Sequence, residues 1–501
     1  MTRDAAAIGA GLDPVRVARQ IRVGERIHVV GAGGAGASGA ALLAHAAGAA
    51  ISACDAGGPS PYTAALEAIG VTVATGHDPS HVTTAPAPDR LAVTKALTAV
   101  DPDNAELRAA REAGIPVEPW QQVIADAAVG HTLVAIAGTH GKSTTAGWLV
   151  HVLATAGLDP SAFVGALLPS DLAGGTPATA RVGNGAPFVV EADEYAGNFD
   201  AYRPAVAVLT SAEWDHPDVF ADGAAVEHAF VRWLDAMPGG TVVANIADPG
   251  VAAIVARLAP DRSAVLAAML SDDGPVPGSL VGRIVAEDPD GTTLVLDLPD
   301  AAEPPLRVRL PTAGRHNAAN ALGVAGAALV LGVAPAAIVR GLETFGGVGR
   351  RLERKGEAND VVVYDDYGHH PTAIRATIEA IRQREPGRRL WAVYEPLTYH
   401  RTAALLGEFA DALATADAVA IADIWPGRDP DTTIASASGL AAAVADHRAD
   451  IPVEAPGSVE ATADRLADAV RPGDAVLVMG GGHSYRIATG LLRRLEERSR
   501  R

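Results

Sequence analysis

Lys142 and Ser143 follow the glycine-rich segment GTHG at residues 138–141, and this combination points to phosphate chemistry. Successive backbone N–H groups of such a loop, with the N-terminus of a following helix, can surround a phosphate group. Lys142 would contact the terminal phosphates of a nucleoside triphosphate, and the Ser143 hydroxyl would face Mg²⁺. The alternative is a glycine-rich turn carrying a solvated lysine. The residues predicted to bind the nucleotide are Gly138, Thr139, His140, Gly141, Lys142, Ser143 and Thr144.

The segments around this loop supply the elements that it needs. Residues 132–137 (TLVAIA) form an apolar run of strand length, and residues 148–157 (WLVHVLATAG) have the pattern of a helix. Ile136 stands where the longer form of the loop has its first glycine, so the loop is the shorter form. The flanking strand and helix therefore favour a triphosphate site over a plain turn.

Two later strands are predicted to bring a carboxylate and an imidazole to the same loop. Glu191 ends the apolar run PFVVE, and His216 follows the run AVAVL. Ligands gather at the carboxyl ends of parallel strands, so both side chains should face Lys142. A carboxylate suits Mg²⁺ better than an imidazole does, which makes Glu191 the stronger candidate. Either residue could instead support or cap a neighbouring element. The predicted metal ligands are Ser143, Glu191 and His216.

The first part of the chain contains a second glycine-rich loop after a strand. Gly31, Gly33 and Gly36 form a GxGxxG pattern after the apolar run at residues 27–30. Asp55 ends the next strand, where an acid that binds a ribose would lie. The pattern indicates a diphosphate near a helix N-terminus and does not identify the compound that carries it.

The last part of the chain alternates strands and helices again and opens with a basic segment. Arg350 and Arg351 lie in FGGVGRRLERKG, an unusual concentration of positive charge in an acidic protein. The strand VVVYDD leads to His369 and His370 before a helix that starts with proline. These histidines are adjacent and no cysteine is near them in the sequence, which does not favour zinc.

Composition limits the classes of function. The 501 residues carry a net charge of −19, which argues against nucleic acid or an anionic membrane as a partner. The single cysteine, Cys54, excludes an internal disulfide framework, fits a cytoplasmic location and is expected to be a small buried apolar residue. No signal peptide or membrane-spanning segment is evident. We expect an α/β protein with a Rossmann-like domain at residues 1–127, a central P-loop-type domain at 128–342 with a β-rich excursion at 265–310, and a second Rossmann-like domain at 343–501.

The order of these motifs resembles that of the Mur ligase family of ATP-dependent peptidoglycan enzymes. The resemblance covers nearly the whole chain. The segments that carry it are GAGGAGASG (31–39), GTHGKST (138–144), VEADEY (190–195), EWDHPD (213–218), GRHNAANA (314–321), FGGVGRR (345–351) and DDYGHHPTAI (365–374).

The resemblance implies a reaction and a role for each site residue. ATP with Mg²⁺ would phosphorylate the lactyl carboxylate of UDP-N-acetylmuramate, and the amine of L-alanine would displace phosphate from this acyl phosphate. Lys142, Glu191, His216, Arg351 and His369 would be catalytic. Asn317 and Asp366 would contact the adenine and ribose of ATP. The substrate-binding residues would be Gly31, Gly33, Gly36, Asp55 and Arg401. A monomer or homodimer is expected.

The sequence departs from the family pattern in the last domain. Leu397 and Thr398 stand where a histidine and a basic residue are usual, with His400 as a possible replacement, and His483 stands for an aspartate. These changes affect the predicted amino-acid pocket. Three alternatives stay open: a ligase that attaches a recycled murein tripeptide, a nicotinamide-dependent dehydrogenase, and a non-catalytic nucleotide-binding regulator.

Overall fold

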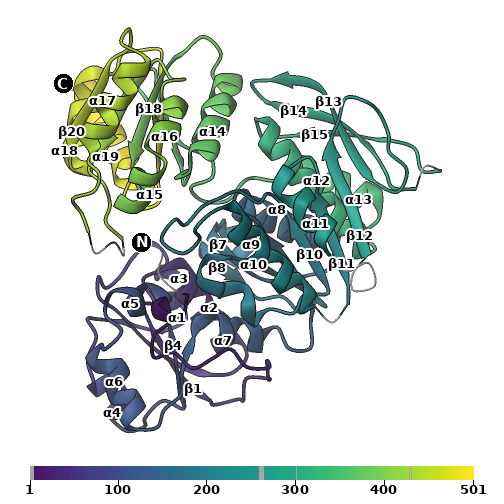
Figure 1. Ribbon diagram of the computed structural model, residues 1–501, viewed down its shortest axis with the longest axis vertical. Helices are drawn as coiled ribbons and strands as arrows, with labels where there is room; N and C mark the ends of the chain where they lie inside the picture. The colour runs from purple at the N-terminus through teal and green to yellow at the C-terminus, as the bar shows by residue number, and fades with distance from the viewer. Residues whose placement is uncertain are drawn as a thin grey trace.

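The computed structural model describes residues 5–237, 239–258, 264–300, 302–427, 429 and 431–500, with side chains from residue 7 onward. Its helices and strands form three sheet-centred parts that follow one another along the chain (Figure 1). The predicted α/β class is confirmed. The domain boundaries themselves stay a prediction.

The first sheet is parallel, with the order β3-β2-β1-β4-β5. The strands are short, and β1 and β4 near the centre of the sheet are almost fully buried, as expected for a parallel sheet covered by helices on both faces. Its strands are β1 (Arg26–Val30), β2 (Ala50–Asp55), β3 (Val73–Thr75), β4 (Arg90–Val93) and β5 (Val117–Pro119). The helices are α1 (Ala5–Ile8), α2 (Ala35–Ala46), α3 (Ala64–Ala68), α4 (Ser80–Thr83), α5 (Lys95–Val100), α6 (Ala105–Glu112) and α7 (Trp120–Ala127).

The central sheet has the order β15-β14-β13-β12-β11-β10-β6-β9-β7-β8. Its strands are β6 (Thr132–Ala137), β7 (Ser161–Leu168), β8 (Ala178–Arg181), β9 (Pro187–Ala192), β10 (Val206–Leu209), β11 (Thr241–Asn245), β12 (Ala264–Leu270), β13 (Leu280–Asp288), β14 (Gly291–Asp297) and β15 (Leu306–Leu310). The helices are α8 (Lys142–Thr155), α9 (Ser170–Ala173), the 3₁₀ segment η1 (Tyr195–Ala201), α10 (Gly223–Asp235), α11 (Pro249–Arg257), α12 (Arg315–Val330) and α13 (Pro335–Glu343).

The β-rich excursion expected at residues 265–310 corresponds to β12–β15. β14 and β15 pair antiparallel at one edge of the sheet, whereas β12 still runs parallel to β11. The sequence did not predict β7 and β8 at the other edge. Helix α12 packs against one face of the parallel strands, and its small residues allow a close approach. A Cβ at Gly326 would lie 2.6 Å from the Val243 side chain of β11.

The third sheet has the order β16-β17-β21-β18-β19-β20, and only β16 is antiparallel to its neighbour. Its strands are β16 (Glu353–Ala358), β17 (Val361–Asp366), β18 (Arg389–Glu395), β19 (Ala418–Ala422), β20 (Val453–Gly457) and β21 (Asp474–Gly480). The helices are α14 (Pro371–Arg384), α15 (Tyr399–Ala404), α16 (Leu406–Leu413), α17 (Ala437–His447), α18 (Val459–Ala469) and α19 (Tyr485–Ser499). The basic segment thus ends in an edge strand that the sequence did not predict.

Polar contacts hold the third part against the central one. Gln383 of α14 donates its amide to the carbonyl oxygens of Asp288 at 3.0 Å and Gly291 at 2.9 Å. The same side chain accepts a hydrogen bond from the backbone N–H of Gly314 at 2.8 Å. Figure 1 shows α14 facing the β13–β15 edge of the central sheet. The contact therefore fixes the approach of the third part to the start of α12.

The first and central parts also touch. Lys95 of α5 donates to the carbonyl oxygen of Ala196 at 2.7 Å, and the Thr179 hydroxyl donates to the carbonyl oxygen of Ala35 at 2.9 Å. Among the described helices, none is long and apolar enough to cross a membrane.

Glu25, which precedes β1, gives a prediction about stability in acid. It accepts hydrogen bonds from Arg19 at 3.0 Å and from the backbone N–H of Arg22 at 3.0 Å, and Arg90 lies 3.1 Å away. Burial opposes its ionisation, but these partners outweigh burial and lower the pKa of Glu25 to about 2. Since this pKa is below the ordinary value of 4.5, the stabilisation is present above about pH 4.5 and is lost as the pH falls toward 2.

We expect Glu25→Gln to lower the stability of the folded chain at pH 7 by roughly 1.5–3 kcal/mol, the range for hydrogen bonds to charged groups. Thermal unfolding of the variant and the unchanged protein, followed from pH 7 to pH 3, measures the difference. The difference should shrink as the pH falls below about 4.5, where the unfolded carboxyl takes up a proton. The exposed Glu67→Gln is the control in the same sheet region. A difference that does not change with pH would contradict this account.

Candidate active site

The loop at residues 138–141 connects β6 to α8, as the sequence predicts. Gly138 has a φ of +135°, and a Cβ there would lie 2.7 Å from the carbonyl oxygen of Ser211. Gly141, with a φ of +80°, immediately precedes the helix. The first N–H groups of a helix have no partner within it and can donate to an anion. The loop is thus pressed against the segment after β10 and presents the N-terminus of α8.

Lys142 lies among three carboxylates. Its ammonium donates to the carbonyl oxygen of Gly138 at 2.6 Å and to Oε2 of Glu194 at 3.0 Å, and Oδ1 of Asp193 lies 3.9 Å away. Burial opposes the charge on Lys142, but Glu194, Asp193 and Glu191 outweigh burial and raise the pKa of Lys142. Burial and the negative charge of Asp193 raise the pKa of Glu194 to about 7. Lys142 is therefore a cation held in place by acidic groups.

Ser143, Glu191 and Arg351 form a chain of hydrogen bonds next to Lys142. The Ser143 hydroxyl donates to Oε1 of Glu191 at 3.0 Å and accepts from the Arg351 guanidinium at 2.8 Å. The other oxygen of Glu191 accepts from the backbone N–H of Gly165 at 2.6 Å. Arg351, from the start of the third part, thereby reaches the first turn of α8. The structure brings these three predicted site residues together.

His216 lies near the carboxylate oxygen of Glu194 that does not bond Lys142. Its Nε2 is 3.7 Å from Oε1 of Glu194, and its Nδ1 is 3.2 Å from the guanidinium of Arg401. Arg401 belongs to α15 of the third part and is 2% exposed. Its guanidinium donates to Oδ1 of Asp215 at 2.8 Å. Burial opposes ionisation of Asp215, but Arg401 outweighs it and holds the pKa of Asp215 well below its usual range. His216 and Arg401 thus meet at a buried ion pair between two parts of the chain.

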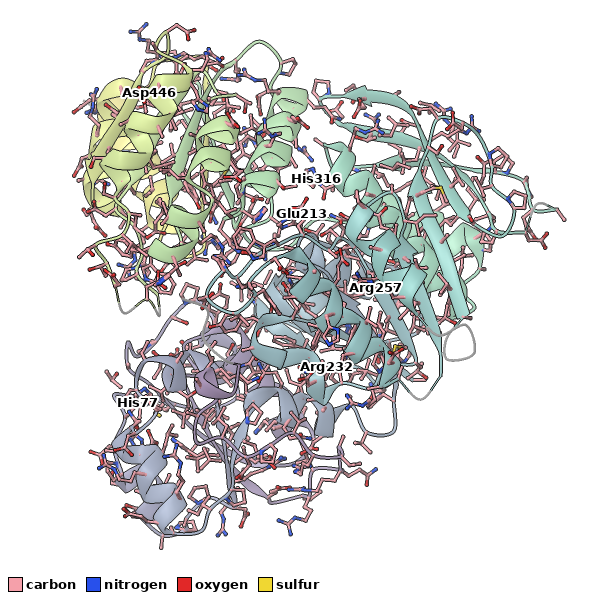
Figure 2. All side chains as sticks on the ribbon, in the orientation of Figure 1. His77, Glu213, Arg232, Arg257, His316 and Asp446 are labelled. Atoms are coloured by element: carbon pink, nitrogen blue, oxygen red, sulfur yellow. The ribbon has the colours of Figure 1, made fainter. Side chains whose placement is uncertain are left out.

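The two adjacent histidines point to different partners. His369 lies with Nδ1 2.9 Å from the carbonyl oxygen of Tyr367, and burial and the nearby Arg401 hold its pKa well below the usual range. His370 is 3.6 Å from Oε2 of Glu213. Figure 2 labels Glu213 near the junction between the central part and α14. His369 is therefore neutral at pH 7 and lies close to the Arg401 cluster.

His140 of the phosphate loop belongs to the same junction. Its Nε2 lies 2.9 Å from Oε2 of Glu213, and its ring centroid is 4.7 Å from that of His370. Burial and the charge of His140 lower the pKa of His370 to about 4. His370, the N-cap of α14, is thereby linked to the phosphate loop.

Asn317 and Asp366 each make hydrogen bonds within the chain itself. Asp366 accepts from the backbone N–H groups of Gly368 and Leu352, each at 2.7 Å. Asn317 donates to the carbonyl oxygen of Ala313 at 2.8 Å. The N-cap of α12 is Gly314, so Asn317 lies inside the first turn of this helix. His316, which is not among the predicted site residues, is half-buried beside the junction with the third part (Figure 2), and burial lowers its pKa against the opposing charge of Asp366.

The first glycine-rich loop lies between β1 and α2. Asp55 accepts from the backbone N–H of Gly33 at 3.0 Å, so the acid stabilises the loop. A Cβ at Gly36 would lie 2.2 Å from the Trp120 ring, which explains the need for glycine there. Gly31 has a φ of +87°.

The first part also meets the third part. Tyr62, in the turn before α3, lies beside Arg350 of the third part, and the two side chains influence each other's pKa.

Four acidic residues of this region were not in the predicted site. Asp193 and Glu194 surround Lys142, Glu213 pairs with His140, and Asp215 pairs with Arg401. All lie in VEADEY or EWDHPD, the segments in which Glu191 and His216 are the predicted site residues. Their concentration after apolar strands was the available signal.

Comparison with known proteins identifies the family and the fold. Three family models match: "Mur ligase family, catalytic domain" at residues 26–132, "Mur ligase middle domain" at 136–328 and "Mur ligase, glutamate ligase domain" at 350–482. A protein of Kineococcus radiotolerans named UDP-N-acetylmuramate–L-alanine ligase is 39% identical over 98% of this chain and 99% of its own length. A protein of Mycolicibacterium smegmatis with the same name is 38% identical over 91% of this chain and 92% of its own.

Solved structures show the same fold. The UDP-N-acetylmuramate-alanine ligase of Thermotoga maritima superposes with a TM-score of 0.76 at 22% identity, covering 95% of this chain and all of that one. A murein peptide ligase of Psychrobacter arcticus gives 0.71 at 26% identity, covering 94% of this chain and 99% of that one. With curated relatives this similar over nearly their full length, the chain belongs to the Mur ligase family.

Proposed function

We propose that this chain joins L-alanine to the lactyl carboxylate of UDP-N-acetylmuramate at the expense of ATP, forming ADP and phosphate in peptidoglycan precursor synthesis. The observation that carries the proposal is the cluster of Lys142, Ser143 and Glu191 at the N-terminus of α8. It occurs in a chain 39% identical to a relative named for this reaction. We also propose that the protein is cytoplasmic, a monomer or homodimer, and without a nucleic-acid or membrane partner.

Each part of the chain has a proposed share in binding. The loop at Gly31, Gly33 and Gly36, with Asp55, holds the UDP group of the substrate. The phosphate loop binds the ATP phosphates, and Asn317 and Asp366 lie on the adenosine side. Their polar atoms already bond the backbone, so they would shape that side of the site as well as contact the nucleotide.

The residues around Lys142 fit a hard divalent cation. Ser143 and Glu191 offer oxygen donors within hydrogen-bond distance of each other, and oxygen is the donor that Mg²⁺ prefers. His216 lies in a cluster with Asp193 and Glu194 whose ligand atoms are all within 4.8 Å of one another. We propose Ser143, Glu191 and His216 as the residues that hold Mg²⁺, directly or through water. The ion would neutralise negative charge on the phosphates of ATP.

The chain's own cations would stabilise the transferred phosphoryl group. Lys142 is a half-buried cation fixed at the loop, and Arg351 donates a hydrogen bond to Ser143, the next residue of the chain. Such charges act strongly because they are positioned before the reaction begins. Neutral His369 and charged Arg401 would orient the muramoyl carboxylate or the acyl phosphate. No protein nucleophile is needed, since the carboxylate attacks the γ-phosphate and the amine then expels phosphate.

The altered residues of the third part favour a small amine. Leu397 pairs with Trp425 in an isolated β-bridge, and the Trp425 ring lies 6.2 Å from that of His483. His400 is engaged by Asp429, with Nδ1 3.1 Å from Oδ1. Apolar groups at this place would disfavour a tripeptide with several carboxylates more than a zwitterion with one.

We therefore expect L-alanine to be preferred over glycine by roughly tenfold to a few hundredfold, because one methyl group in an apolar pocket supplies no more. Serine should be a detectable poor substrate, and the tripeptide L-Ala-γ-D-Glu-diaminopimelate should react little or not at all. Phosphate release from ATP with UDP-N-acetylmuramate and each amine, with the products identified by mass spectrometry, measures the order.

Other outcomes of this assay, together with binding measurements for ATP, NADH and a uridine nucleotide, select among the alternatives. A wide preference for the tripeptide would favour the recycling ligase. The structural similarity to a murein peptide ligase is consistent with that alternative. No turnover with any amine, from protein that binds ATP, would favour a regulator. Tight binding of NADH without binding of a uridine nucleotide would favour the dehydrogenase.

A further inference from the structure

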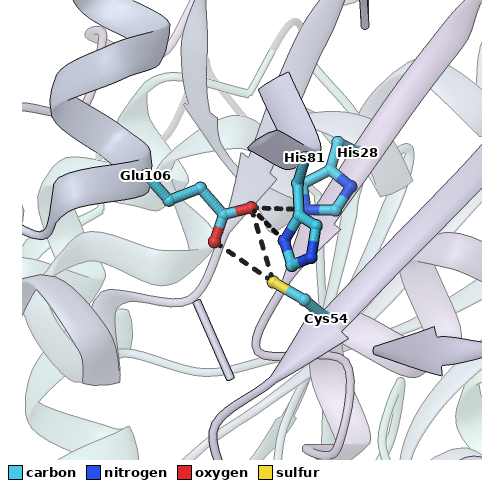
Figure 3. A group of neighbouring side chains, drawn as sticks. All are labelled: His28, Cys54, His81 and Glu106. Carbon is cyan, nitrogen blue, oxygen red and sulfur yellow. Dashed lines mark hydrogen bonds and ion pairs between the residues drawn. The ribbon is translucent and has the colours of Figure 1, made fainter. Parts of the chain in front are cut away.

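A second group of chemically reactive side chains lies in the first part of the chain, outside the site described above. It comes from four separate segments: the strands β1 and β2 and the short helices α4 and α6. Figure 3 shows the side chains converging on one carboxylate. The ligand atoms all lie within 4.8 Å of one another, and the residues are His28, Cys54, His81 and Glu106.

The distances in this cluster are short. Nε2 of His28 lies 2.7 Å from Oε1 of Glu106, and Nδ1 of His81 lies 3.0 Å from the same oxygen. Sγ of Cys54 is 3.3 Å from Oε2 of Glu106. A tetrahedral zinc with bonds of 2.0–2.3 Å separates its ligand atoms by about 3.3–3.7 Å. Small outward movements of these side chains would therefore admit the ion.

One nitrogen of the cluster lacks a hydrogen-bond partner. His28 is 2% exposed, and its buried Nε2 faces Glu106 without the geometry of a hydrogen bond. Its other nitrogen, Nδ1, is 2.8 Å from the Ser52 hydroxyl, which fixes the ring. A ligating histidine is typically oriented in this way through its second nitrogen. Nε2 of His28 is therefore directed at the same carboxylate oxygen as Nδ1 of His81, at the place where a metal ion would lie.

We propose that this cluster binds one Zn²⁺ as a structural site. A thiolate from Cys54, a carboxylate from Glu106 and two neutral imidazoles would balance the charge of the ion. Balanced charge matters because the ligands are buried, with only His81 reaching 22% side-chain exposure. The N, S and O donors are those that zinc uses, and four protein ligands leave no position for a substrate.

The site also explains residues that the nucleotide site leaves unused. The sequence predicts Cys54 as a small buried apolar residue; the structure buries it, but among polar partners that include His77 at 3.3 Å. Cys54 directly precedes Asp55, which holds the first glycine-rich loop through Gly33. Zinc would thus tie β1 and β2 to α4 and α6 near the end of β2, where Asp55 contacts this loop.

The single cysteine gives a direct test, because any thiolate–metal absorption must come from Cys54. We expect the full-length protein to bind about one Zn²⁺ that a mild chelator does not remove. Protein loaded with Co²⁺ instead should show a thiolate-to-metal charge-transfer band and the visible bands of tetrahedral cobalt. Binding at the two other histidine–carboxylate clusters cannot give this band, since they contain no cysteine.

The variants separate this site from general metal binding. Cys54→Ser, which nearly keeps the volume, should abolish the charge-transfer band and the chelator-resistant Zn²⁺. His81→Asn, at the most exposed ligand, should weaken zinc binding while the cobalt band remains at high Co²⁺. The exposed His45→Asn in α2 of the same part is the control and should change neither.

Circular dichroism would verify that each variant folds, and if Cys54→Ser does not, His81→Asn carries the test. Zinc should raise the thermal midpoint of the unchanged protein and not that of Cys54→Ser. The proposal is wrong if the unchanged protein shows no charge-transfer band with Co²⁺, or if a folded Cys54→Ser or His81→Asn binds Zn²⁺ as tightly as the unchanged protein.

Discussion

Replacing Lys142 with alanine is expected to lower turnover roughly a thousandfold or more while the fold persists. The ammonium lies at the turn from the phosphate loop into α8 and would offset charge on the phosphoryl group during transfer. Its loss removes the cation that contacts Glu194 and Asp193. Because the pKa of Glu194 is already raised to about 7, this carboxyl can take up a proton, which limits the damage to stability.

Phosphate release measures turnover, and circular dichroism and thermal unfolding report the fold. Lys355→Ala is the matched control, since Lys355 lies on the edge strand β16, pairs with Glu353 and is outside the site. Lys142→Arg tests geometry, because it keeps the charge but not the compact ammonium. Near-normal turnover of Lys142→Ala would show that this loop is not the phosphate site.

The fold was largely predictable because its signals are local. Apolar runs of strand length alternate with helical segments, and glycine occupies positions such as Gly138 whose backbone requires it. Strands without such a signal were missed. Residues 353–358 form β16 from ERKGEA, a polar sequence that becomes a strand only because β17 offers a free edge.

The candidate site was predictable only in outline. Motif order placed Lys142, Ser143 and Glu191 on one edge of the sheet, and the structure brings Ser143 within hydrogen-bond distance of Glu191, whereas Lys142 bonds Glu194 instead. Which carboxylate neutralises Lys142 depends on backbone turns after β9, and no spacing in the sequence encodes that choice. The cluster around Glu106 was invisible for the same reason, since its members are far apart in sequence and meet only when α4 packs against α6.

Arg401 gives the second large expected effect. Arg401→Met removes the charge and keeps most of the length, but it leaves the Asp215 carboxylate buried without its arginine between two parts of the chain. Breaking a buried pair from one side typically costs about 3–5 kcal/mol. We expect a clear loss of thermal stability together with a loss of turnover of at least a hundredfold, because the group proposed to hold the anionic substrate is also gone.

The double variant Asp215→Asn with Arg401→Met separates the two causes. Removing both charges avoids the lone buried carboxylate, so the double variant should be more stable than Arg401→Met alone. If Arg401 serves only to join the parts of the chain, turnover should recover along with stability. If it binds the muramoyl carboxylate or the acyl phosphate, turnover should stay low in a protein whose stability has returned. We expect the second result, because Arg401 also contacts His216 and lies beside neutral His369, two residues that we propose take part in the reaction.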